Sequence, residues 1–421
     1  MGLIKTFLLY ILLFLLIYLG PEPIGPTTFS QVWKIPLFVY LFWQVLIIRR
    51  KRKPDFIKWS YARASKNLIT SGFSVSYFAN IIDFLRYMMF PLMYEFASFK
   101  IKNLKNLDKM LLGFAQFVII SGIPFILGLL QSKAKDTLLY GGFDSYSGMF
   151  QNSHGAAIVT TTAVLILLAF IKLKSSIIRY PKLNYLLLLF GIYLIYATFI
   201  RTGYAMFAVG LIILFMPKKL SIKQILTGTV VISLLVFGFV YLLETNEFFY
   251  NRIFDIRNGK QTAAGSGRLL FWKASWDLWY NGNIFEMFFG FGYIGLVEHM
   301  FEAVADYDIA HNEFFTQLGQ NGLLGVAFFI GYLIALFKFI WKRRRLSSYR
   351  LGMAIFFLYV SLMMTQGGMW FELDIFMVLV FVKLEFEHLM NIKIKKQSKF
   401  VETRQKEKMD SLNTLKYGHI V

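Results

Sequence analysis

Long apolar runs are the feature that most restricts how this chain can fold. A run of about 18 residues with few charges can cross the roughly 30 Å hydrocarbon layer of a membrane. Eleven runs of this kind are clear, near residues 3–19, 31–48, 81–98, 110–130, 156–171, 183–200, 203–217, 223–243, 319–340, 351–366 and 370–388. The chain is 57% hydrophobic and 18% aromatic, which exceeds the composition of soluble domains. We therefore predict an all-α polytopic membrane protein and exclude a water-soluble enzyme.

The first run has a length at which a transmembrane helix and a signal peptide overlap. It begins almost at the first residue, and no small-residue cleavage signature precedes the Pro-Glu-Pro turn at 21–23. This favours a retained first helix.

The basic residues predict the orientation. The net charge is +21, which could indicate nucleic-acid binding if the bases shared one polar face. They lie instead in clusters between apolar runs, and such clusters mark cytoplasmic loops. The clusters are 49–66, 99–109, 172–182, 218–223, 338–350 and the C-terminal tail. Eleven crossings cannot place all of them on one side, so we predict an additional, weaker crossing over 64–80.

About twelve crossings place both termini in the cytoplasm. Residues 1–394 then form a single transmembrane domain, and 395–421 form a basic cytoplasmic tail predicted to be disordered. Residues 244–318 become one large external loop with five bases against ten acids, a net charge of −5. Its apolar-periodic stretches at 269–280 and 284–296 predict short amphipathic helices at the membrane surface.

Several chemistries are excluded or unsupported. The chain has no Cys, which excludes disulfides, thiolate nucleophiles and thiolate metal sites. The spacing of His154, His299 and His311 matches no zinc motif. We therefore expect no metal and no cofactor.

Two arginines are candidates for binding an anion on the external side. Arg201 lies at the turn between two apolar runs, where an arginine can also serve only as an interfacial anchor. Arg268 follows Gly265, Ser266 and Gly267, a segment that allows close backbone approach to a phosphate. Its guanidinium can contact phosphate through two parallel hydrogen bonds, although a surface arginine in a flexible loop explains the pattern as well.

His311 and Asn312 precede an apolar run at the predicted external face. A histidine there can act as a general base, or it can be structural. The glycines that follow, Gly319, Gly322 and Gly325, predict tight packing of that helix against a neighbour.

Other polar residues sit at helix ends or inside predicted crossings. Asn152 and His154 precede another helix, for which helix capping is the default reading. Asp83 and Arg86 are three positions apart within a predicted crossing, so they form either a functional pair or a neutralised one. Glu372, at the start of the last crossing, is either a solvated interface residue or part of the external cavity.

Four segments in this order resemble the O-antigen ligase and polysaccharide polymerase superfamily of bacterial envelope proteins. They are FQNSHGAA (150–157), FIRTGYAMFAVG (199–210), GSGRLLFW (265–272) and HNEFFTQLGQNGLLG (311–325). The resemblance spans about residues 70–390. Two departures are Gln320, where the family usually has Glu, and Ser153, where it usually has Pro.

The resemblance implies metal-independent glycosyl transfer from a saccharide on polyprenyl diphosphate, at the outer face of the bacterial cytoplasmic membrane. Arg201 and Arg268 would hold the diphosphate, and His311 would take the proton from the acceptor hydroxyl. Asn152, His154 and Asn312 would contribute to substrate binding. Partners would be the lipid-linked saccharide and the bilayer, with flippase and chain-length regulator proteins, and not nucleic acid.

The large loop favours a polymerase over a ligase, because its negative charge and its aromatic residues suit neutral sugar rings better than a phosphorylated lipid core. We expect the acceptor groove between this loop and residues 140–154 and 367–372. A lipid-linked saccharide flippase or other transporter, and a scaffold without catalysis, are the alternatives of other classes. A transporter would show paired half-structures with interrupted helices, and the sequence shows no such symmetry.

Overall fold

The computed structural model describes residues 3–24, 27–48, 53–71, 77–132, 145–216, 233, 237–238, 240–247, 250–251, 256–257, 260–261, 268–304, 310–367 and 370–417. The predicted crossing at 223–243 lies mostly outside these residues. The same holds for the glycine segment 265–267 and for residues 140–144 of the expected acceptor groove.

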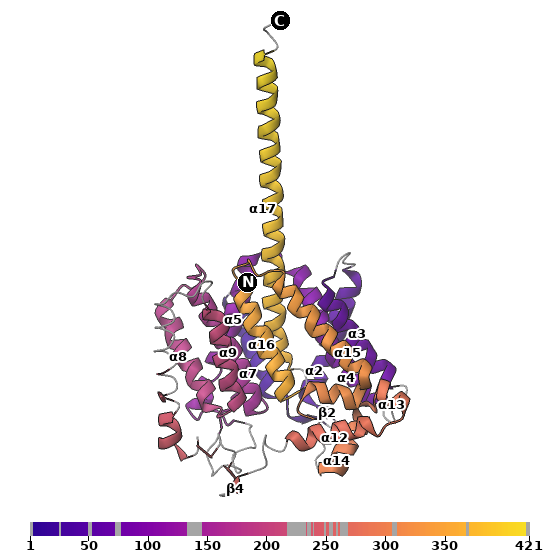
Figure 1. Cartoon of the computed structure of the whole chain (residues 1–421). Helices are drawn as coiled ribbons and strands as arrows, with labels where there is room; N and C mark the ends of the chain where they lie inside the picture. Colours follow the sequence, from indigo (N-terminus) through magenta and orange to yellow (C-terminus); the bar gives the residue numbers. More distant parts are fainter. Residues whose placement is uncertain are drawn as a thin grey trace.

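The described chain is helical apart from two very short hairpins (Figure 1). The helices are α1 (Leu3–Tyr18), α2 (Phe29–Ile47), α3 (Asp55–Ser71), α4 (Tyr77–Lys100), α5 (Leu104–Ile120), α6 (Ile123–Ile126), α7 (Ser153–Lys172), α8 (Pro181–Ala197), α9 (Arg201–Phe215), α12 (Arg268–Tyr280), α13 (Ile284–Phe289), α14 (Gly292–Val304), α15 (Glu313–Trp341), α16 (Tyr349–Thr365) and α17 (Phe371–Tyr417). Strand β1 (Pro23–Ile24) pairs antiparallel with β2 (Thr27–Thr28), and β3 (Ile256–Arg257) pairs with β4 (Lys260–Gln261).

Four helical segments of the described chain are long and apolar enough to cross a membrane: α2, α5 continued through α6, α7 and α15. Shorter apolar helices are the Leu8–Tyr18 part of α1, α8, α9 and α16. Together they make this a multi-pass helical membrane protein. The total of twelve crossings stays a prediction.

Helix α7 forms the centre of the bundle, and nearly all of its residues are buried. It packs against α5, α8, α9 and α16. Two glycines allow neighbouring helices to approach it closely: a Cβ on Gly191 of α8 would lie 2.5 Å from Val164, and one on Gly210 of α9 would lie 2.3 Å from Leu165. Small residues at helix contacts are the usual means by which helices pack in a membrane.

The predicted crossing over 64–80 does not coincide with one helix, and that the chain crosses the membrane here stays a prediction. Helix α3 already begins at Asp55 and ends at Ser71, and α4 begins at Tyr77. The buried face of α3 carries Ser60, Arg63, Lys66 and Asn67. Their spacing of three or four positions places them on one side of the helix. Arg63 and Lys66 belong to the cluster 49–66 that was predicted to be a cytoplasmic loop. In the structure both side chains are buried against other helices.

Short helices are present where they were predicted within the large loop, as α12, α13 and α14. Gly290 follows α13 and Gly292 is the first residue of α14, and both have positive φ, of 80° and 75°. The three helices lie at the end of the bundle away from the projecting part of α17 (Figure 1). That this end is external stays a prediction.

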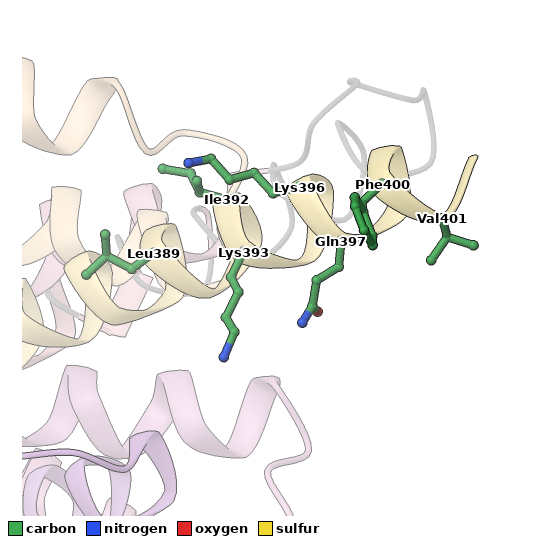
Figure 2. A pocket seen from close by; sticks show the side chains of 7 residues that line it. All are labelled: Leu389, Ile392, Lys393, Lys396, Gln397, Phe400 and Val401. Atoms are coloured by element: carbon green, nitrogen blue, oxygen red, sulfur yellow. The ribbon is translucent and has the colours of Figure 1, made fainter. Parts of the chain in front are cut away.

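Helix α17 continues through the predicted tail to Tyr417 and projects beyond the bundle (Figure 1). This differs from the disorder expected for 395–421, and the reason is local: the segment is rich in Lys, Glu and Gln, which favour helix. The pocket shown in Figure 2 is formed by side chains of α17 alone, among them Ile392, Lys396 and Phe400. One helix cannot enclose a substrate, so this pocket is not a candidate for the functional site.

Candidate functional site

Arg201 is the first residue of α9 and its side chain is exposed. The turn from α8 places Phe199 at a positive φ of 50°. The start of α9 lies against the start of α7, because a Cβ on Gly203 would lie 2.8 Å from the Cβ of Ala157. A helix N-terminus carries a partial positive charge, so this corner combines a helix dipole with a guanidinium.

The start of α7 is capped as predicted. The Asn152 side chain accepts a hydrogen bond from the Gly155 backbone N–H at 2.8 Å. His154, in the first turn, has its Nδ1 2.9 Å from Nε2 of Gln366, just beyond α16. A role for Asn152 and His154 in substrate binding stays a prediction.

The same end of α16 also holds the start of α15. Asn312 Nδ2 donates to the Met364 carbonyl at 3.0 Å. The Asn312 Oδ1 caps α15 by accepting from the Phe314 N–H at 2.9 Å. The polar starts of α7 and α15 therefore converge on one helix end, although more than 150 positions separate His154 from Asn312.

His311 has a left-handed backbone conformation with a φ of 49°. Its ring lies edge-on to Phe271 of α12, with centroids 5.4 Å apart. Phe271 is three positions, about one helical turn, after Arg268, so the two side chains project from the same side of α12. Trp272 stacks on Phe315 with centroids 5.5 Å apart. A positive φ at a non-glycine residue is uncommon and clusters at functional sites.

Three of the remaining predicted residues lie in α4 and α17. Asp83 and Arg86 pair within α4 at 3.9 Å, with Asp83 buried and Arg86 exposed. Glu372 lies half-buried in the first turn of α17. Trp370, just before it, lies against Gly155 at the start of α7.

A buried polar network at the start of α15 was not predicted from the sequence. Glu313, the first residue of α15, forms an ion pair with Arg63 of α3. The same carboxylate oxygen accepts hydrogen bonds from Tyr87 of α4 at 2.7 Å and from Gln317 at 2.9 Å. Arg63 also donates to the Tyr359 hydroxyl of α16 at 3.4 Å. Four helices thus meet at the Arg63–Glu313 pair, and Glu313 directly follows Asn312.

One sequence signal could have revealed this network. Glu313, Gln317, Gln320 and Asn321 lie within nine positions at the start of an otherwise apolar run, and they are all buried. The Asn321 side chain donates to Gln317 at 2.9 Å, so the row is internally bonded. A polar row with helical spacing on an apolar helix predicts a partner on another helix.

Gln320 has a partner that explains its amide. Its Nε2 donates to Asp83 Oδ2 at 2.7 Å. A glutamate at this position would place two carboxylates in contact unless one took up a proton. Gln in place of the family's usual Glu therefore agrees with the presence of Asp83 on α4, because an amide can donate a hydrogen bond to that carboxylate.

Helix α15 is interrupted at Gly322, whose φ of 61° and ψ of −163° are not helical. Here the glycine prediction was incomplete. Gly319 faces Leu296 and Gly325 faces Lys66, as packing would require, but Gly322 breaks the helix and lies against the Phe288 backbone. Gly290 lies equally close to the backbone of Asn321. The end of α13 is therefore seated on the break in α15.

We expect Gly322→Ala to lower the free energy of unfolding by about 3 kcal/mol or more, since the conformation is essentially restricted to glycine. A Cβ would also lie 2.5 Å from the Phe288 carbonyl carbon. The measurement is the thermal unfolding midpoint of the purified protein in detergent. Gly238→Ala is the matched control, because a Cβ there meets nothing within 4 Å. Equal midpoints for the two variants would contradict the expectation.

Within the described residues, no group of three or more His, Asp or Glu side chains could hold a metal ion. The expectation of metal-independent chemistry does not rest on this observation and stays a prediction.

Comparison with curated proteins finds no match to this chain. Comparison with protein families finds one, over the part that carries Arg201, Arg268, His311 and Asn312. This match confirms the family resemblance over this region. It gives no support to a flippase. Residues 186–330 match the family model described as Wzy_C, O-antigen ligase.

Proposed function

We propose that this protein polymerises oligosaccharide repeat units carried on polyprenyl diphosphate, at the outer face of the bacterial cytoplasmic membrane. The observation that carries the proposal is the contact between Phe271 and His311, which brings a general-base candidate to the helix that begins with Arg268. Both residues lie inside the region that matches the O-antigen ligase model. A lipid-linked donor also suits a site at the end of apolar helices.

In the proposed reaction, a hydroxyl oxygen of the acceptor sugar attacks the anomeric carbon of the donor sugar. His311 takes the hydroxyl proton. The bond between the anomeric carbon and the diphosphate oxygen breaks, and polyprenyl diphosphate leaves with the bonding electrons. Arg201 and Arg268 stabilise the charge that develops on the leaving diphosphate. Asn312 holds the start of α15 against α16 and so positions His311.

The large loop supports polymerisation over ligation. It carries a net charge of −5, and α12 presents two exposed aromatic residues, Trp276 and Tyr280, that can stack on sugar rings. A phosphorylated lipid acceptor would require a basic surface instead. The ligase reaction uses the same donor and the same base, so it is the second candidate.

Incubation of purified protein with polyprenyl-diphosphate repeat unit as the only substrate separates the two reactions. We expect a ladder of saccharide lengths, because a polymerase uses a second lipid-linked repeat as its acceptor. The products are resolved by electrophoresis after release from the lipid. If product forms only after a separate lipid acceptor is added, the protein is a ligase and the polymerase proposal is wrong.

We expect Arg201→Lys and Arg268→Lys each to reduce activity by about tenfold or more, although charge is kept. A compact ammonium group cannot reproduce the planar two-point contact of a guanidinium with a diphosphate. Initial rates of lipid-linked donor consumption measure the effect. Arg404→Lys, on the exposed part of α17, is the matched control. Full activity of the Lys variants with loss in the Ala variants would leave only an electrostatic role, and tolerance of Ala would refute the diphosphate contact.

A further inference from the structure

A second cavity, of about 610 Å³, lies at the other end of α15. We call it the basic groove. It is lined by residues before and within the start of α3, by the second half of α15 and by residues of α17. Its lining includes Trp59, Gly331, Ile334, Lys338 and Lys342. None of these residues belongs to the site proposed for glycosyl transfer.

The lining changes from apolar to basic along α15. Gly331 lies against the ring of Trp59, since a Cβ there would come within 2.5 Å of it. Ile334 follows, 48% exposed, and then come Lys338 and Lys342, both exposed. These positions span eleven residues, or about 16 Å of helix. A phospholipid has the same order, with acyl chains toward the membrane centre and a phosphate at its surface.

The two lysines distinguish this end from the other bases in the groove. Lys53 is paired with Glu95 at 2.8 Å, and Arg343 is paired with Glu385. Among the described side chains, no ion pair engages Lys338 or Lys342. They lie four positions apart on one helix, where like charges repel, so a bound anion would remove an unfavourable interaction.

The position of the groove decides between two phosphate-bearing lipids. The uninterrupted part of α15 from the break at Gly322 to Lys338 alone spans 16 positions, or about 24 Å of helix, and Asn312 lies before that break. A polyprenyl diphosphate held near Asn312 therefore cannot place its phosphates between the two lysines. The run Lys342, Arg343, Arg344 and Arg345 next to the groove is typical of a cytoplasmic membrane surface, where anionic phospholipids bind between helices.

We propose that the basic groove binds an anionic phospholipid of the cytoplasmic leaflet. Its phosphate contacts Lys338 and Lys342, and its acyl chains lie along Ile334 and Trp59. The proposal rests on the proposed orientation of the chain, but not on His311, Arg201 or Arg268. Its test is a binding measurement, so its failure is distinguishable from failure of the proposed enzyme activity.

The experiment titrates the detergent-purified full chain with phosphatidylglycerol and counts bound lipid by native mass spectrometry. We expect one tight site, weakened about 30-fold in the double variant Lys338→Gln/Lys342→Gln, in line with the attraction that each basic residue contributes near a membrane surface. Lys338→Arg/Lys342→Arg should retain it. Lys393→Gln/Lys396→Gln on the projecting part of α17 (Figure 2) makes the same charge change and should have no effect.

Equal binding of phosphatidylglycerol by the Lys338/Lys342 Gln variant and the wild type would overturn the proposal. So would equally tight binding of phosphatidylcholine, because that lipid has no net charge. If inorganic phosphate alone displaces the phospholipid, the groove is a site for a free anion and the lipid proposal is wrong. Displacement by polyprenyl diphosphate at equal concentration would assign the groove to the substrate instead.

Discussion

Replacing His311 by Ala is expected to abolish polymer formation while the protein remains folded and inserted. Removal of a general base typically reduces the rate by about 100- to 10,000-fold. The measurement is the rate of polymer formation from lipid-linked repeat unit, normalised to the amount of folded protein from size-exclusion chromatography. His299→Ala, on α14 of the same loop, is the matched control and should keep normal activity.

The backbone of His311 calls for a second variant. Its φ of 49° strains most residues, but Asn adopts this conformation several-fold more often than most. His311→Asn therefore preserves the turn before α15 and removes the imidazole. We expect it to be as stable as wild type and as inactive as His311→Ala. A near-normal rate of polymer formation in either variant, if that variant is stable, would show that the role of His311 is structural.

The apolar runs predicted much of the fold because length and hydropathy are local properties. The runs at 81–98, 156–171, 351–366 and 370–388 correspond to α4, α7, α16 and the first half of α17. The cap at Asn152 could be predicted for the same reason, since a side chain that bonds three residues ahead needs only local sequence.

Helix α3 could not be predicted in this way. A helix that buries Arg63, Lys66 and Asn67 has the composition of a cytoplasmic loop, and only its partner distinguishes the two. That partner, Glu313, lies 250 positions further along the chain. The positive-inside rule counts charges and has no means of detecting that one of them is paired inside the bundle.

In the candidate site, too, the residues could be predicted from local sequence, but their arrangement could not. His311, Asn312, Arg201 and Arg268 could be selected from the sequence because each lies beside an apolar run. Their arrangement could not, because it depends on contacts at the end of α16, where Met364 and Gln366 bond to Asn312 and His154. The break at Gly322 was hidden for a related reason: a glycine in an apolar run predicts close packing and a helix break equally well.

Truncation of Glu313 is expected to have the largest effect on stability. In Glu313→Ala, the Arg63 guanidinium stays charged and buried without its carboxylate, and breaking a buried pair costs about 3–5 kcal/mol. Tyr87 and Gln317 lose their acceptor at the same time. The thermal unfolding midpoint in detergent measures the loss. The control is Lys58→Ala, which breaks an exposed pair with Asp55 on the same α3, where the contribution is about 0–1 kcal/mol.

Removal of Arg63 should lower stability less than removal of Glu313. This difference allows the interaction between the two side chains to be measured with a double variant. In Arg63→Met, Glu313 keeps its hydrogen bonds to Tyr87 and Gln317, and a carboxylate can take up a proton whereas a guanidinium cannot lose one. The double variant Arg63→Met/Glu313→Ala should be more stable than Glu313→Ala alone, because no buried charge remains unpaired. Additive losses in this cycle would show that the two side chains stabilise the bundle independently. Recovery of stability without recovery of polymer formation would instead show that Glu313 is also needed to hold Asn312 and His311 at the start of α15.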